Sequence, residues 1–261
     1  GNWQINIWIP LVMSIIAVVL AVIAPFAYDD QMKETVQTAD GKTENAAQAE
    51  IEAARARMLV KPSGLVNFFT MFYGFVCMFI MYGAQQYTKA FGMSNCGLTE
   101  AQAAGMTSIY TVGSVIAVVF WAVMMGKLQW NPLKVVLIDS IFTAVALAIV
   151  LLVSNVAVIY VAIALLGFFA AGGALQTGLG IRQEMCPGPK GRNTGIYYTW
   201  MGLASCFLPY IVSAMTKSIG EASAVYTMMG LLLAAAVIAI LMMAYLAVQY
   251  KKIFGKSALS K

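Results

Sequence analysis

Seven long apolar stretches, almost free of charged residues, follow one another along this 261-residue chain. They are residues 1–28, 62–88, 101–126, 135–152, 156–181, 193–216 and 222–250. Each can cross a hydrocarbon core of about 30 Å as a helix, which needs about 20 residues. Hydrophobic residues make up 61% and charged residues 10% of the chain, whereas soluble domains average roughly half and a quarter. We therefore predict an all-α membrane protein with seven transmembrane helices.

Lys and Arg are distributed unevenly between these stretches. Of the 16 such residues, 14 lie in the C-terminal tail and in the segments after the first, third and fifth stretches, and the other two are Lys89 and Lys217. Because cytoplasmic loops carry the excess of cations, we predict that the C-terminus is cytoplasmic and that the first helix enters from outside. Anionic lipid headgroups suffice to explain the net charge of +5, so we expect the lipid bilayer as a partner and no nucleic acid.

A polar interruption divides the chain into unequal parts. We predict a transmembrane helix at 1–28, a cytoplasmic central loop at 29–63, a six-helix bundle at 64–250 and a cytoplasmic tail at 251–261. Within the loop, residues 44–58 are rich in Ala and other helix formers. They predict a short helix near the membrane surface, with a solvated linker as the alternative. Because the chain opens on Gly1 without an initiator Met, we expect a fragment or a processed chain.

The sequence carries no signature of an enzyme. It has no Gly-Lys-Ser or Gly-Lys-Thr phosphate loop, and with no His it has neither a Ser-His-Asp triad nor a His-bearing metal site. Its four Cys residues are scattered, and we interpret them as free thiols. We therefore predict no catalytic activity, no cofactor and no metal site.

The one-plus-six division distinguishes between classes of membrane protein. The last stretch has no interior Lys for a retinal Schiff base, which argues against a rhodopsin. One helix, a long loop and six helices are instead what remains when a twelve-helix transporter of two six-helix halves loses its first five helices.

Two sets of residues carry a resemblance to a known family. The first set resembles the outer loop, eighth helix and next cytoplasmic turn of the major facilitator superfamily. It comprises Gly97–Gly105, Ser108, Gly113, Gly126 and Lys127. A second set is similar to the loop between the tenth and eleventh helices of that family, and it comprises Glu184, Pro187, Gly191, Arg192, Gly195, Gly202 and Pro209. The resemblance implies that the chain covers helix six through helix twelve. It also implies alternating access around a midplane site, with a small-molecule solute and the missing N-terminal helices as partners.

Neutral polar and aromatic residues mark the expected cavity. The candidate substrate-binding residues are Tyr82, Gln85, Gln86, Gln176, Tyr198 and Trp200. Amides both donate and accept hydrogen bonds, and Tyr and Trp add an apolar face with a polar tip, so this set suits a hydroxylated or carboxylated solute. The resemblance makes the second and fifth stretches the cavity-lining helices seven and ten. The alternative is that these side chains serve the membrane interface, where Tyr and Trp gather.

Asp139 is the single charged residue well within a stretch, about two turns from Pro132, which with Asn131 predicts the start of that helix. A carboxylate there is costly unless it is paired or faces water. The candidate gating or ion-pair residues are Lys127, Asp139, Arg182, Glu184 and Arg192. A cytoplasmic gate, a static ion pair and proton coupling by Asp139 all remain open.

The fifth stretch has a face of small residues. Its glycines are Gly167, Gly172, Gly173, Gly178 and Gly180. Such a face allows the backbones of two helices to approach closely in a membrane, and we predict a tightly packed helix over 156–181.

Together these features predict the C-terminal part of a secondary active transporter that moves a small polar or organic-anion solute by alternating access. The expected location is the plasma (inner) membrane. The alternative is a seven-helix receptor-like or structural membrane protein without transport activity.

Overall fold

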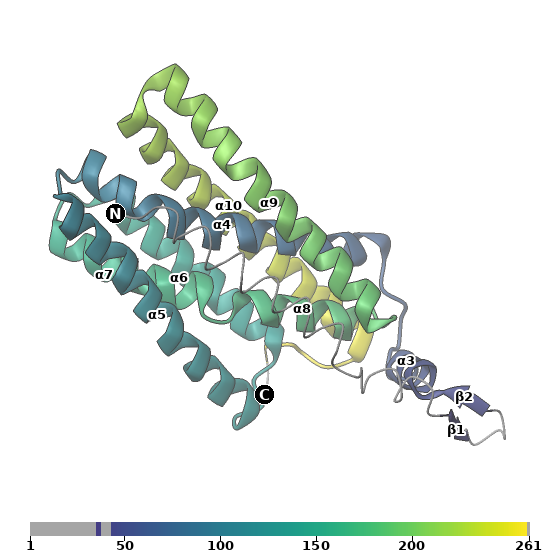
Figure 1. Cartoon of the computed structure of the whole chain (residues 1–261). Coiled ribbons are helices and arrows are strands. Elements are labelled where there is room, and N and C mark those ends of the chain that lie inside the picture. The colour runs from purple at the N-terminus through teal and green to yellow at the C-terminus, as the bar shows by residue number, and fades with distance from the viewer. Residues whose placement is uncertain (1–34, 38–42, 260–261) are drawn as a thin grey trace, which may run out of the picture. The chain divides into compact units, whose positions relative to one another are not determined.

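A computed structural model describes residues 35–37 and 43–259 (Figure 1). The predicted helix at 1–28 lies outside these residues. The chain divides into two compact units, residues 1–53 and 54–261. In the first unit, strands β1 (Thr35–Gln37) and β2 (Thr43–Asn45) pair antiparallel. Helix α3 (Ala46–Ala56) follows β2 directly and lies within the range predicted for a short helix.

The second unit is a helical bundle, and it confirms the predicted all-α membrane fold. Its helices are α4 (Gly64–Asn95), α5 (Glu100–Gly126), α6 (Pro132–Leu152), α7 (Val156–Leu166), α8 (Ala174–Met185), α9 (Lys190–Ile219) and α10 (Glu221–Phe254). Within the described part of the chain, α4, α5, α6, α9 and α10 are each long and apolar enough to span a membrane.

Side-chain caps explain where several of these helices begin. Ser63 accepts a hydrogen bond from the Val66 N–H at the start of α4, and Thr99 forms a reciprocal capping box with Gln102 at the start of α5. Asn131 caps α6 with Pro132 at its first position, as predicted. Asn155 caps α7 only three residues after α6 ends, so a tight turn joins these two helices.

Hydrogen bonds between distant segments sort the helix ends into two groups. At one end of the bundle, Asn95 donates to the Ala222 carbonyl (3.2 Å) and Tyr226 donates to the Leu151 carbonyl (3.1 Å). At the other end, the Leu59 N–H donates to the Ile253 carbonyl at 2.7 Å. Among the described residues, every Lys and Arg except Lys89 and Lys217 belongs to this second end, which we call the cationic end.

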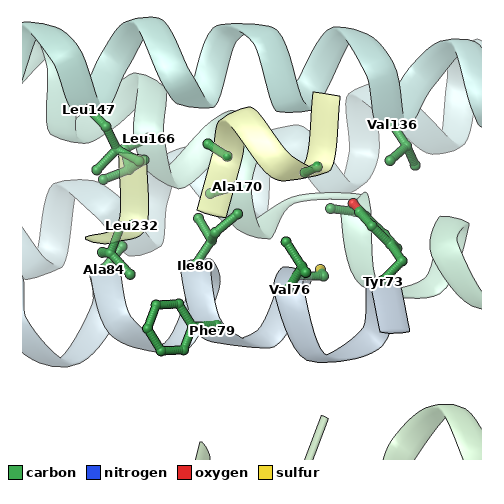
Figure 2. Close-up of a cluster of buried hydrophobic side chains, with 14 of the residues drawn as sticks. Tyr73, Val76, Phe79, Ile80, Ala84, Val136, Leu147, Leu166, Ala170 and Leu232 are labelled. Atoms are coloured by element: carbon green, nitrogen blue, oxygen red, sulfur yellow. The ribbon is translucent and has the colours of Figure 1, made fainter. Parts of the chain in front are cut away.

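Helix α4 lies at the centre of the bundle and packs against α5, α8, α9 and α10. Figure 2 shows Tyr73, Val76 and Ile80 rising from α4 toward Ala170 and Val136. Helix α5 is peripheral, and several of its large apolar side chains are exposed, among them Val115, Ile116 and Val119. Hydrocarbon is the environment in which such a surface is stable.

The fifth predicted helix differs from the prediction, because it is broken. Helix α7 ends at Leu166, a π-helical turn, η1 (Gly167–Ala171), follows, and α8 starts only after Gly172 and Gly173. The glycines lie directly against α5: a Cβ on Gly167 would overlap the Tyr110 carbonyl oxygen, and one on Gly172 would overlap the Ala117 side chain. Hydropathy measures only apolar length, so it could not distinguish a continuous helix from one interrupted by a π turn.

The close packing of Gly167 predicts the effect of a methyl group there. Gly167→Ala must push α5 away from η1, and overpacking of this kind costs about 1–3 kcal/mol. Gly230→Ala is the matched control, because a Cβ at Gly230 in α10 meets nothing within 4 Å. Thermal unfolding in detergent should therefore show a lower Tm for Gly167→Ala and an unchanged or slightly higher Tm for Gly230→Ala. Equal Tm values for the two variants would contradict the described packing.

Candidate functional site

A row of aromatic rings runs along one face of α4. Spacings of four and three residues place Phe68, Phe72, Phe75 and Phe79 on that face. Successive ring centroids are 5.4, 5.4 and 6.0 Å apart in stacked arrangements. Trp200 of α9 meets Phe68, Phe72 and Phe75 edge-on at 6.3, 5.5 and 6.5 Å.

Two of the predicted binding residues continue this row. Tyr82 and Gln86 follow Phe79 at the same three- and four-residue spacings, so they extend the aromatic face toward the end of the bundle opposite the cationic end. We call Phe68, Phe72, Phe75, Phe79, Tyr82 and Gln86 the α4 stripe. Phe68 is 40% exposed and Gln86 is exposed, so this chain covers the stripe only in part.

The structure does not bring the remaining predicted binding residues to the stripe. Gln85 is exposed but lies about 100° around α4 from Gln86. Tyr198 is 46% exposed and stands about 200° around α9 from Trp200, with its ring 6.2 Å from that of Tyr197. Gln176 belongs to α8, but its side chain is outside the part of the chain that the structure describes.

Asp139 lies in a small internal pocket. Its side chain is 1% exposed, and within the described residues neither carboxyl oxygen has a hydrogen-bond partner. The space open to the centre of a water molecule is about 10 Å³, which is room for about one water. The pocket is lined by Tyr73, Cys77, Ile80, Asp139, Ser140, Thr143, Phe169, Ala170, Ala174 and Ala239.

The pocket lies beside the break in the fifth predicted helix. Phe169 and Ala170 precede Gly172 and Gly173, and Ala174 follows them. The Trp121 indole of α5 packs against Gly173, where a Cβ would come within 2.8 Å of the ring. The same indole N–H approaches the Asp139 carboxyl without reaching hydrogen-bond geometry, and it too is buried without a partner.

The other predicted ion-pair residues lie near the cationic end. Lys127 is exposed at the C-terminus of α5, and Arg192 is exposed in the first turn of α9. The Glu184 carboxylate accepts a hydrogen bond of 2.6 Å from the Tyr250 hydroxyl. Among the described residues, none of the predicted cations forms an ion pair with Asp139.

Arg182 is buried, with 2% of its surface exposed, and it binds only neutral oxygens among the described residues. Its Nη1 donates to the Asn67 carbonyl (3.3 Å), to Asn67 Oδ1 (3.1 Å) and to Thr70 Oγ1 (3.3 Å). Its Nη2 donates to Asn193 Oδ1 at 3.2 Å. We call Arg182, Asn67, Thr70 and Asn193 the Arg182 network, and it ties α8 to both α4 and α9.

Sequence reasoning missed the three acceptors of this network. Asn67 and Thr70 lie three residues apart at the start of an apolar stretch, and Asn193 opens another. The available signal was the presence of amide side chains at the starts of apolar stretches, where they can accept hydrogen bonds from a buried cation. The sequence predicted an ion pair for Arg182 and not these neutral acceptors. No spacing rule links Arg182 to residues that are so distant from it in the sequence.

Comparison with known proteins identifies the class to which this helical membrane bundle belongs. The family model of the Major Facilitator Superfamily matches residues 1–209 and 92–259, and the chain belongs to this family.

Curated relatives agree with this assignment. The chain is 29% identical over 145 residues to the inner membrane transport protein YdiM of Escherichia coli (strain K12), and these residues are 56% of this chain and 36% of that protein. It is also 30% identical over 186 residues to the uncharacterized MFS-type transporter YfkL of Bacillus subtilis (strain 168). These 186 residues are 71% of this chain and 45% of that protein. The chain thus spans less than half the length of these relatives.

Among solved structures, the chain resembles a mutant of the peptide transporter POT in complex with alafosfalin. The TM-score is 0.62 at 17% identity, and the match covers 83% of this chain and 44% of that chain. The structure of POT in complex with sulfate matches with a TM-score of 0.63 over the same shares. At this identity the likeness shows the fold alone.

The Arg182 network predicts a large difference between two arginines near the same end of the bundle. Arg182→Gln leaves oxygens of Asn67, Thr70 and Asn193 without their donor; Thr70 and Asn193 are buried, and each buried group left unpaired costs about 1–3 kcal/mol. Arg192→Gln is the control, because Arg192 is exposed. In thermal unfolding, Arg182→Gln should lower the Tm by several degrees more than Arg192→Gln does. Similar Tm values would mean that the network does not stabilise the fold.

Proposed function

We propose that this chain is the C-terminal part of a secondary active transporter that moves a small polar or organic-anion solute by alternating access. The observation that carries the proposal is the partly uncovered α4 stripe, which presents stacked rings, a tyrosine and an amide on one face of a membrane-spanning helix. Such a face has groups that can orient a solute.

Family membership and length support a division of the site between two halves. In this family, bundles related by internal symmetry enclose the site near the bilayer midplane. The chain covers 36% of YdiM and 30% of YdiN, two E. coli proteins that are named inner membrane transport proteins. We infer an inner-membrane location, and we infer that further N-terminal helices face the α4 stripe across the solute.

The chemistry of the stripe favours a solute with both a flat or apolar part and a hydrogen-bonding part. Trp200 and the Phe rings offer apolar faces and edges, while Gln86 offers a donor and an acceptor near Tyr82. Helix α8 faces α4 from within the same bundle, and Gln176 remains a proposed contributor from that helix. Gln85 and Tyr198 lie off the stripe, so we propose no solute contact for them in this arrangement of the helices.

The exposed charges near the cationic end support a cytoplasmic gate. Lys127, Glu184 and Arg192 are exposed there, so they are available for ion pairs with the N-terminal half. A gate would form such pairs in one conformation and break them in the other. Arg182 has a different part in this proposal, because its network holds α4, α8 and α9 together as a rigid unit. Cation enrichment at this end supports a cytoplasmic C-terminus.

The division of the site predicts that transport requires both halves. In liposomes with an imposed solute gradient, the chain alone should give no saturable uptake of a panel of radiolabelled carboxylates and amino acids. The same chain joined to its preceding helices should take up at least one of them saturably. Saturable uptake by the chain alone would overturn the proposed division. Absence of uptake in both preparations would count against transport of this solute class.

The stripe also predicts which of two neighbouring amides contacts the solute. Gln86→Leu keeps the bulk but removes the polar groups, and a lost buried hydrogen bond of about 1.4 kcal/mol corresponds to about a tenfold weaker affinity. Gln85→Leu is the matched control, since Gln85 is off the stripe. Solute affinity of the complete transporter, measured by equilibrium binding, should fall about tenfold or more for Gln86→Leu and change little for Gln85→Leu. The reverse order would place the site on a different face of α4.

A further inference from the structure

We propose that Asp139 is a proton-binding site whose protonation controls the broken helix between α7 and α8. In a transporter, such a site would couple H⁺ movement to alternating access, and that part of the inference rests on the function proposed above. The local switch itself does not depend on transport. The argument rests on the burial of the carboxyl, on the groups that face it and on its position beside the break.

The first step is that no hydrogen-bond donor or cation among the described residues stabilises a negative charge on Asp139. Both carboxyl oxygens are buried without a hydrogen-bond partner among the described residues. The nearest basic residue along α6, Lys134, holds its Nζ 4.4 Å from the centre of the Trp130 ring instead. Arg182 is bound to neutral oxygens of α4 and α9. An ionised carboxylate in such surroundings is far more costly than a neutral carboxyl, so this packing suits the protonated form.

The second step is an inventory of the groups that face the carboxyl from each element. Helix α4 contributes Tyr73 and Cys77, which are uncharged at neutral pH. Helix α6 adds the hydroxyls of Ser140 and Thr143, and Ser140 already donates to the Val136 carbonyl at 2.7 Å. The lining residues of η1, α8 and α10 are apolar, namely Phe169, Ala170, Ala174 and Ala239. Among the residues that the structure describes, no cation and no second carboxylate lines the pocket.

The same inventory favours H⁺ over a metal cation as the ligand. Sodium needs several oxygen ligands and enough space to hold them around the ion. This pocket offers one carboxyl group and few other oxygens, and it has room for about one water. A proton requires only the carboxyl: an O–H bond forms when a carboxylate oxygen takes H⁺ from water, and release returns that H⁺ to water.

The third step connects the proton to the break. Residues on both sides of Gly172 and Gly173 line the pocket. Trp121 lies between the two features, with its ring against Gly173 and its unpartnered N–H toward the carboxyl. When Asp139 ionises, the Trp121 N–H is a donor without another partner that can stabilise the charge, alongside the hydroxyls that line the pocket. Movement of this indole, or entry of water, then loosens the contact with the break.

The experiment compares the parent chain with Asp139→Asn, which imitates the neutral carboxyl and should fold. Hydrogen exchange of peptides covering residues 167–174, followed by mass spectrometry across a pH series and corrected for the intrinsic pH dependence of exchange, should show faster exchange at alkaline pH in the parent. Asp139→Asn should exchange slowly throughout. Glu100→Gln is the control, because Glu100 is exposed and pairs with Lys89 at the opposite end of the bundle, and it should behave as the parent does.

Two further measurements separate the proposal from its alternatives. An infrared band of a protonated carboxyl should be present in the parent at neutral pH and absent in Asp139→Asn. Trp121→Phe, which removes the N–H, should change the pH dependence of exchange. The proposal would be overturned if the infrared band is absent or if exchange in the parent is independent of pH. It would also be overturned if the change in exchange at fixed pH requires Na⁺. If exchange at residues 167–174 depends on Asp139 and pH but the complete transporter shows no uptake, the proposed transport function is wrong and the proton site is still supported.

Discussion

The hydrogen-bonding requirement of the backbone in hydrocarbon determines most of this structure. Lipid offers no donors or acceptors, so a membrane-spanning segment must satisfy its own N–H and C=O groups, and a helix does so along its length. The helix starts are the weak points, since the first N–H groups have no partner within the helix. Side chains of Ser63, Thr99, Asn131 and Asn155 supply acceptors at four of these starts.

The break at Gly167–Gly173 is the exception, and the chain accommodates it where protein surrounds it. Irregular backbone at membrane depth is tolerated when it is buried in protein, and here Tyr110, Ala117 and Trp121 of α5 pack directly against the glycines. The absence of side chains brings α5 close enough to cover the π turn. The packing that permits the break therefore also brings Trp121 next to the Asp139 pocket.

Much of the fold could be predicted from the sequence, because hydropathy, caps and cation distribution are local signals. Asn131 and Pro132 mark the start of α6, and Asn155 marks the turn before α7. The break could not be predicted, because a glycine-rich apolar run fits both a straight helix and a π turn. The candidate site was only partly predictable: Tyr82, Gln86 and Trp200 lie at one aromatic face, but the phenylalanines that form it have the composition of any lipid-facing helix. Tertiary packing alone reveals which face they occupy.

Two buried residues of the described bundle, Arg182 and Asp139, show how the chemistry of an ionisable side chain determines which partners it needs. A guanidinium keeps its proton at any physiological pH, so a buried Arg182 requires acceptors. Oxygens of Asn67, Thr70 and Asn193 supply them to Nη1 and Nη2, while Nε has no partner among the described residues. A carboxylate has another option, because it becomes neutral by binding H⁺. Asp139 has no donor within hydrogen-bond geometry among the described residues. The arginine therefore suits a permanent connection between helices, whereas the aspartate suits a group whose charge changes as the helices around it rearrange.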